Sequence, residues 1–277
     1  GYRIATDNIC MTHPKNIAQA AEHAIQYLRE QPQLTIAPMA LGDFSGVCEC
    51  RNCRKANGGI DPRLDPNHVV WTFMNEVSNR VARVLPGKGV GFYACYGTMT
   101  RPPAGMKGAP TSMAVITHVA CNAHDAGDAD CPYNKLLLEH LAAIKASGSR
   151  IKARTYTMWY GRFQPLAILD SIRTFRDRGV GAYSCEVMGR DELRNITHWC
   201  MARLLWDPSI EPQKLLEEFT NSYYGAAGPK VLEMLQLIDK QVRTYKYIVF
   251  KTYFDMLTPE LVGRLRALAA SAKQKVD

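Results

Sequence analysis

Two hydrophobic patterns alternate along the chain up to about residue 187. Short continuous apolar runs predict strands buried on both faces, and they lie near residues 4, 36, 92, 116, 154 and 183. Apolar residues at helical spacing fill the stretches between them, as after Pro14 and from about Asn134 to Ala146. Because such strands pair in parallel, the sequence predicts an α/β fold, either an open doubly wound sheet or a (β/α)8 barrel.

The number and order of these patterns favour the barrel. Six strands are two short of eight, so we expect an incomplete (β/α)8 TIM-like barrel whose first two βα units precede this sequence. From Asp191 onward every pattern is helical. The expected domains are therefore a partial barrel of catalytic type over residues 1–207 and a helical region over 208–277 packed on it. The segment from Tyr96 to Ser112 is rich in proline and glycine, so a loop is expected there instead of an outer helix.

Composition and charge exclude some classes of protein. With 277 residues, 47% of them hydrophobic, the chain can bury a large core. The formal net charge of +8 permits a nucleic-acid partner, but lysine and arginine are scattered, and the densest group, residues 150–154, alternates as in a strand. We therefore expect no nucleic-acid partner. The chain has no apolar run as long as the roughly 18 residues of a membrane span, and no signal peptide is visible at Gly1.

Polar and aromatic residues gather where the predicted strands end, which is the edge at which a parallel barrel carries its active site. They are Asp7, Asn8, Asp43, Tyr96, His118, His124, Asp125, Trp159, Tyr160 and Glu186. The aromatic pair Trp159 and Tyr160 can stack on a pyranose ring, although packing explains a single aromatic residue equally well. Trp199 and Trp206 share a helical pattern and are predicted to lie in the core. No glycine-rich phosphate loop follows any strand, which disfavours dinucleotide binding.

Three of the nine cysteines stand close together as Cys48-x-Cys50-x2-Cys53. This spacing suits thiolate ligation of a structural zinc ion, which takes four nitrogen or sulfur donors. Cys10, Cys95 or a histidine are the candidates for the fourth ligand. A disulfide, or buried thiols that shape the loop, are the alternatives. A redox pair of Cys50 and Cys53 would need a helix N-terminus, whereas the glycines and prolines that follow predict a loop.

A second cysteine pair, Cys121 and Cys131, flanks a polar loop that contains His124 and Asp125. Three roles are open for this loop from its residues alone. It can coordinate a metal, be closed by a disulfide, or bind sugar hydroxyl groups.

Three groups of residues carry a resemblance to a known family. They are Asp43, Gly46, Cys48-Glu49-Cys50 and Cys53; then Cys121, Asp130-Cys131-Pro132 and Asn134; and finally Ala202-Arg203-Leu204-Leu205-Trp206-Asp207-Pro208. With them the chain resembles the bacterial domain first catalogued as domain of unknown function 4838. That domain is now grouped with glycoside hydrolase family 163, which contains endo-β-N-acetylglucosaminidases that act on complex N-glycans. The similarity covers nearly the whole chain, from Asn8 to the helices around Tyr224.

The resemblance implies a glycoside hydrolase acting on glycans or glycoproteins that contain N-acetylglucosamine. In a retaining, substrate-assisted reaction the 2-acetamido oxygen is the nucleophile, and the protein supplies a general acid and a second carboxylate. Asp43 is the leading candidate, with Glu186 or Glu49 as its partner. A loop-capping role for Asp43 and an arginine-paired structural role for Glu186 are the alternatives. The two catalytic carboxylates are expected within about 10 Å of each other in one pocket.

The resemblance also bears on the remaining residues and on location. Asp7, Asn8, Tyr96, Trp159 and Tyr160 are candidates to line the substrate site because they follow predicted strands. The resemblance implies the same role for the loop of His124 and Asp125. No cofactor is required for such catalysis. A secreted or periplasmic location is favoured. The alternative function is a non-catalytic, carbohydrate-binding relative that keeps the barrel without the acid pair.

Overall fold

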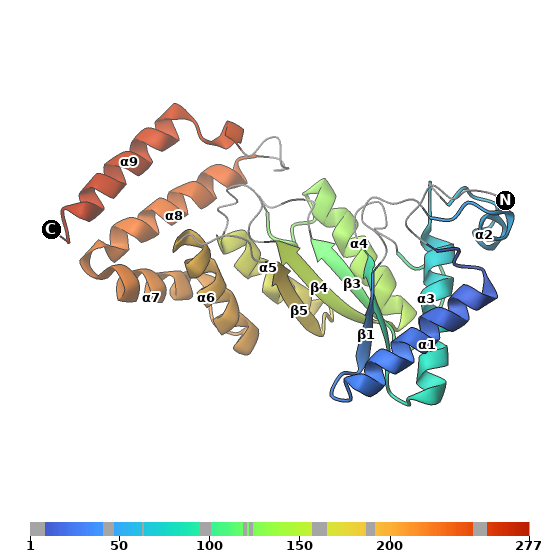
Figure 1. Ribbon diagram of the computed structural model, residues 1–277. Helices are drawn as coiled ribbons and strands as arrows, with labels where there is room; N and C mark the ends of the chain where they lie inside the picture. The colour runs from blue at the N-terminus through green and yellow to red at the C-terminus, as the bar shows by residue number, and fades with distance from the viewer. Residues whose placement is uncertain are drawn as a thin grey trace. The chain divides into compact units, whose positions relative to one another are not determined.

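The computed structural model describes residues 9–40, 47–62, 64–94, 101–118, 121, 124–156, 165–186, 192–245 and 254–276 (Figure 1). The chain divides into two compact units, each drawn from separate stretches of sequence. The first unit comprises Gly1–Thr117, Glu139–Arg154 and Gly179–Ser184, and the second comprises His118–Leu138, Thr155–Arg178 and Cys185–Asp277. The predicted domain boundary at residue 207 remains a prediction.

Five strands form one parallel sheet. They are β1 (Ile36–Met39), β2 (Gly89–Ala94), β3 (Met113–His118), β4 (Arg150–Tyr156) and β5 (Ala182–Glu186). Their order in the sheet is β1-β2-β3-β4-β5, the same as their order in the chain. A doubly wound sheet reverses its order at a switch point, and the five described strands contain no reversal. Five of the six expected strands are therefore observed in a singly wound sheet, and the one expected near residue 4 lies outside the described residues.

The helices follow the predicted alternation and then continue to the end of the chain. They are α1 (Pro14–Glu30), α2 (Arg51–Ala56), α3 (Asn67–Val84), α4 (Pro132–Ser147), α5 (Pro165–Asp177), α6 (Glu192–Trp206), α7 (Pro212–Tyr224), α8 (Gly228–Arg243) and α9 (Pro259–Lys273), with short 3-10 segments η2 (Gly225–Ala227) and η3 (Phe254–Met256). Proline stands in the first turn of α1, α7, α8 and α9, where its missing amide hydrogen costs no helical hydrogen bond. No described helix is both long enough and apolar enough to span a membrane.

Two helices of the first unit cover one face of its strands β1 and β2. In the first unit, α1 and α3 lie beside β1 and β2 (Figure 1). Trp71 of α3 packs edge-to-face on Phe92 of β2, with ring centroids 4.9 Å apart, so Phe92 belongs to the face covered by helices. Side chains alternate along a strand, and Tyr93 therefore belongs to the opposite face.

The connection from β2 to β3 is a loop over its described part, residues 101–112, as the proline and glycine content predicts. Asn75 of α3 fixes this loop with both ends of its side-chain amide. It donates to the carbonyl of Lys107 at 3.0 Å and accepts from the amide of Ala109 at 2.9 Å. The loop thus replaces an outer helix while keeping its backbone groups hydrogen-bonded.

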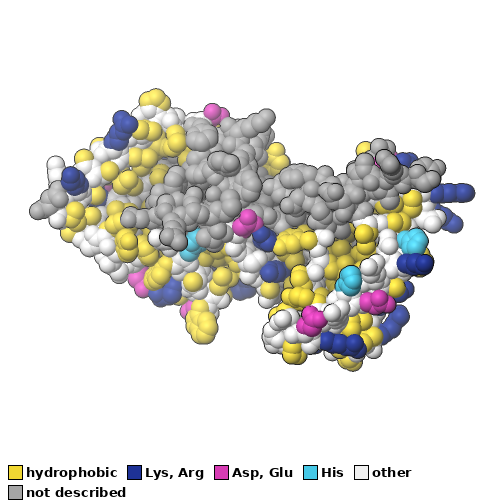
Figure 2. All heavy atoms as spheres, viewed as in Figure 1, with side chains coloured by type: hydrophobic (Ala, Val, Ile, Leu, Met, Phe, Trp, Pro, Cys, Tyr) yellow, Lys and Arg dark blue, Asp and Glu magenta, His cyan; other side chains and the backbone are white. Residues whose placement is uncertain are grey.

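Consecutive helices of the second unit pack on one another from α5 to α9. Trp199 of α6 contacts Phe219 of α7, with ring centroids 5.5 Å apart. The prediction that Trp206 is a core residue is wrong, because this side chain is 92% exposed at the end of α6. On the face drawn in Figure 2, lysine and arginine side chains are interspersed with acidic and apolar ones among the described residues.

Candidate functional site

Four cysteine thiols of the first unit meet at one point. The Sγ atoms of Cys10, Cys48, Cys50 and Cys53 all lie within 4.8 Å of one another. Cys10 Sγ is 3.7 Å from the sulfurs of both Cys50 and Cys53. The structure therefore brings together the three predicted ligands and identifies Cys10, one of the candidates, as the fourth thiol.

The local fold of residues 50–59 corrects one expectation. Cys50 stands at the N-cap of α2, and Cys53 lies buried within this six-residue helix instead of in a loop. The glycines that suggested a loop lie just after the helix. Gly58 and Gly59 adopt φ of +68° and +85°. A positive φ suits glycine, so the pair ends the helix. Cys50 and Cys53 thus have the helical position that a redox pair needs, but they share it with two further thiols.

The protonation of these thiols is unequal. Burial raises the pKa of Cys48 far above its usual range and also raises that of Cys53, although Thr12 partly opposes the second shift by hydrogen bonding. Burial acts on Cys50 in the same direction, but hydrogen bonds from the Cys53 backbone and the neighbouring thiols outweigh it and lower its pKa to about 7. Four thiolates in this space would repel one another, and a divalent cation removes that repulsion.

The size of the cluster matches a four-thiolate metal site. A tetrahedral ion with metal–sulfur bonds of about 2.3 Å separates its sulfurs by about 3.8 Å. The observed separations of 3.7 Å from Cys10 to Cys50 and Cys53 agree with this value. Two separations within the cluster therefore already have the value of a tetrahedral site, and all four sulfurs lie within 4.8 Å of one another.

Glu49 lies in the same loop and is already engaged in an ion pair. Its carboxylate is 3.5 Å from the guanidinium of Arg54, which also reaches Asp61 at 3.6 Å. Both partners of the first pair remain partly exposed. Solvent screening makes such pairs weak, so their main effect here is to orient the end of the loop beside Cys48 and Cys50.

A second cluster lies in the second unit. The donor atoms of Cys121, His124 and Cys131 lie within 4.8 Å of one another, with Cys121 Sγ 3.5 Å from His124 Nδ1. Both sulfurs are buried, at 0% and 2% exposure, and no disulfide joins them. Burial and the neighbouring Cys121 raise the pKa of Cys131. Of the three roles open for this loop, metal coordination has donors in place.

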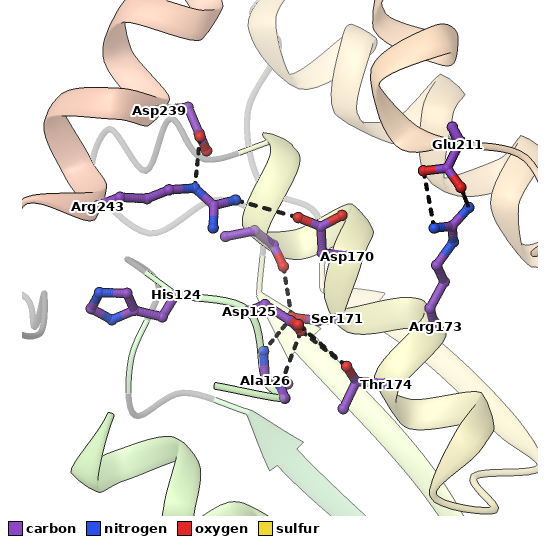
Figure 3. Close-up of polar contacts among 12 residues, drawn as sticks. His124, Asp125, Ala126, Asp170, Ser171, Arg173, Thr174, Glu211, Asp239 and Arg243 are labelled. Carbon is purple, nitrogen blue, oxygen red and sulfur yellow. Dashed lines mark hydrogen bonds and ion pairs between the residues drawn. The ribbon is translucent and has the colours of Figure 1, made fainter. Parts of the chain in front are cut away.

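Asp125 organises the loop between the two cysteines. Its carboxylate accepts hydrogen bonds from the Gly127 amide at 3.0 Å and from Thr174 Oγ1 of α5 at 3.1 Å. The Ala126 amide donates to Ser171 Oγ of α5 at 2.9 Å. These hydrogen bonds, drawn in Figure 3, attach the loop to α5. The predicted role of His124 and Asp125 in substrate binding stays a prediction.

A polar group on the face of the sheet opposite Phe92 was missed by the sequence reasoning. Tyr93 of β2 accepts a hydrogen bond from Arg154 Nη1 of β4, and the guanidinium carbon lies 5.3 Å from the ring centroid. The alternation of basic and apolar residues over 150–154, noted above as typical of a strand, was the signal. It places the basic side chains together on one face.

Thr117 of β3 belongs to the same group. Because Tyr93 pairs with Val115, the residue two further along β3 shares the face of Tyr93. Thr117 is 1% exposed, and its Oγ1 has no hydrogen-bond partner among the described residues. A buried hydroxyl of this kind costs free energy unless it bonds to water or a ligand.

The remaining predicted site residues are only partly described. Glu186 ends β5 and is half-buried. Asp7, Asn8, Asp43, Tyr96, Trp159 and Tyr160 lie outside the described residues, so their predicted roles stay predictions, as does the convergence of two carboxylates.

A pocket of about 490 Å³ in the first unit lies between α1 and β1. Its polar lining residues are Asn16, Gln19, His23 and Tyr27. No carboxylate is among the described residues that line it.

A family model described as a domain of unknown function, number 4838, matches residues 2–236. No curated protein matches the chain.

Proposed function

Since the chain belongs to the family of domain of unknown function 4838, we propose that it is a glycoside hydrolase. Its substrates are glycans that contain N-acetylglucosamine, including the N-glycans of glycoproteins. The five strands are part of a (β/α)8 barrel, and the reaction takes place at the carboxyl ends of the strands. The resemblance of its cysteine and carboxylate motifs to family 163 supports this reading.

The observation that carries the proposal is the singly wound sheet with a polar group on the face opposite Phe92. In a barrel this face is the interior, which apolar side chains normally fill. Here Tyr93, Thr117 and Arg154 stand on it. A hydroxyl, a phenol and a guanidinium are suited to sugar hydroxyl and amide groups, which accept and donate hydrogen bonds.

The proposed reaction retains the anomeric configuration in two steps. The 2-acetamido oxygen of the substrate attacks the anomeric carbon, and a carboxylic acid protonates the departing glycosidic oxygen. A second carboxylate accepts a hydrogen bond from the amide and stabilises the charge of the oxazolinium ring. Water then opens the ring while the first carboxylate takes its proton. Asp43 and Glu186 are the proposed pair, and Glu49 ranks below them because it is ion-paired with Arg54.

Glycan release tests the proposal. The full-length protein is incubated with an N-glycoprotein, and released glycans are labelled and separated. Asp43→Asn and Glu186→Gln should each lower release at least about 100-fold, the usual contribution of general acid–base catalysis. Glu233→Gln, an exposed carboxylate that pairs with Lys230 on α8, is the control and should leave release unchanged. No release by the wild type, or undiminished release by Asp43→Asn, overturns the enzyme; glycan binding without hydrolysis would indicate the carbohydrate-binding alternative.

The four-thiol cluster completes the proposal with a structural Zn²⁺. Four thiols at tetrahedral spacing favour zinc, and a site filled by four protein ligands leaves no place for substrate. The zinc ion would connect the segment around Cys10 to the loop of Cys48 and to α2. Metal analysis of the purified protein should find this zinc, and Cys50→Ser should remove it. A cluster that stays free of zinc under reducing conditions with zinc supplied would refute this role.

A further inference from the structure

We propose a second zinc site in the second unit, formed by Cys121, His124 and Cys131. Two thiolates and an imidazole are donors that zinc prefers, and here all three lie within 4.8 Å of one another. For a tetrahedral zinc with bonds of about 2.3 Å to sulfur and 2.0–2.1 Å to nitrogen, sulfur and nitrogen are separated by about 3.6 Å. The observed distance from Cys121 Sγ to His124 Nδ1 is 3.5 Å.

Residues 124–131, the described stretch that carries His124 and Cys131, are held by hydrogen bonds that involve no metal. The side-chain amide of Asn134 donates to the Asp125 carbonyl at 2.6 Å, and the Ala126 amide donates to Ser171 of α5 at 2.9 Å. Cys131 directly precedes α4, and its carbonyl accepts the amide of Lys135 at 2.8 Å. In Figure 3 the imidazole of His124 points away from the contacts that anchor Asp125. Preorganised ligands lose little conformational entropy when a metal binds.

The surroundings of the two sulfurs are apolar. Cys121 and Cys131 belong to a buried cluster with Ile238 and Val242 of α8 and Met256 of η3. Water has poor access to such a site, so the bonds between a cation and its thiolates are strong there. A metal would cross-link the chain after β3 to the start of α4, at the centre of this cluster.

Polar contacts also tie α8 to α5. Arg243 of α8 bonds to Asp239 at 2.7 Å and to Asp170 of α5 at 3.3 Å (Figure 3). The helix α5 that anchors the metal loop through Ser171 therefore also anchors α8. Three donors are present among the described residues, which leaves one tetrahedral position for a water molecule.

Metal content of site-specific variants tests the proposal. The reduced, zinc-loaded chain should contain two zinc ions, as measured by inductively coupled plasma mass spectrometry. Cys121→Ser and His124→Asn should each retain one, Cys50→Ser should also retain one, and the Cys50→Ser/Cys121→Ser double variant should contain none. Cys200→Ala is the matched control, because Cys200 is buried in the same unit but belongs to neither cluster, and it should retain two.

The wild-type protein provides a test that does not depend on variants that fold. X-ray absorption at the zinc edge should show on average three sulfur and one nitrogen or oxygen ligand per zinc, the mean of a four-sulfur site and a two-sulfur site. An average of four sulfurs would mean that only the four-thiol cluster is loaded and would overturn the proposal. So would a zinc content unchanged by Cys121→Ser, or an intact mass of the reduced protein lower by two hydrogens, which indicates a Cys121–Cys131 disulfide.

Discussion

Replacing Cys10 by serine should destabilise the first unit by removing a long-range cross-link. Cys10 and Cys50 are 40 residues apart, whereas the other three thiols lie within residues 48–53. Without Cys10 no metal ion can link residue 10 to the loop of Cys48, Cys50 and Cys53, so the long loop is no longer closed. By the chain-entropy estimate for a cross-link, closing 40 residues contributes about 4 kcal/mol.

Thermal unfolding measures this loss. For a chain of this size, 1 kcal/mol shifts the melting temperature by about 2–4 °C, so Cys10→Ser should lower it by about 10 °C in the presence of zinc. A chelator should lower the wild-type melting temperature by at least the same amount as the Cys10→Ser substitution does. It should change the unfolding of the first unit of the variant little. Cys185→Ser is the matched control, since Cys185 is also a half-buried thiol but belongs to neither cluster.

Two results would refute this reasoning. The first is a wild-type melting curve that a chelator does not change, because a cross-link that depends on metal must fail when the metal leaves. The second is an equal drop for Cys10→Ser with and without zinc, which would show that the serine disturbs packing and not a metal site.

Three further predictions concern packing, pH and the second cluster. Trp71→Ala should cost about 3–5 kcal/mol in urea denaturation, because Trp71 is fully buried against Phe92; a cost below 1 kcal/mol would contradict the packing. Burial raises the pKa of Cys200 to about 12. Since the unfolded thiol ionises first, stability should fall as pH rises above about 9, and this slope should be smaller in Cys200→Ala; equal slopes would argue against burial as the cause. Asp125→Ala should weaken zinc binding at the second cluster about 10–100-fold and leave the four-thiol cluster unchanged, as competition with a chromogenic chelator would show.

The strands were predictable where the chain is continuously apolar, as in β2, which is buried at five of its six positions. Continuous apolar runs mark such strands without ambiguity when glycine or proline bounds them, and the strand expected over residues 34–39 appears as Ile36–Met39. The order of the strands in the sheet could not be predicted from the sequence, because the same apolar runs are compatible with a singly or a doubly wound sheet. Only the pairing of neighbours in chain order separates the two.

The parts of the candidate site that were missed depend on contacts over long sequence distances. Nothing near Cys10 indicates that it meets thiols about 40 residues later, so it could be named only as one of several candidates. Helix α2 has no apolar stripe, and its buried residue is Cys53, which the cluster holds. Contacts of Cys53 with the other thiols stabilise this short helix more than its intrinsic helix propensity does. Because those contacts are not visible in the local sequence, the glycines after the helix suggested a loop.

The prediction for Trp206 failed for a different reason, because a local apolar pattern indicated a buried side chain where the structure has an exposed one. Helix α6 carries apolar residues around much of its circumference, so periodicity alone does not identify its buried face. The structure buries Ile196, Cys200 and Leu204, which follow one another at intervals of four residues. Trp206 lies off that stripe at the helix end, where it is exposed.

The two proposed zinc sites make separable contributions, because they lie in different compact units and share no residue. The four-thiol cluster closes a long loop of the first unit. The second cluster closes only the short loop from Cys121 to Cys131. Its contribution to stability therefore depends on the apolar residues packed around the two cysteines. Stability changes at sites without shared partners add. The losses from Cys10→Ser and Cys121→Ser should therefore sum in the double variant, and any departure from the sum would measure coupling between the units directly.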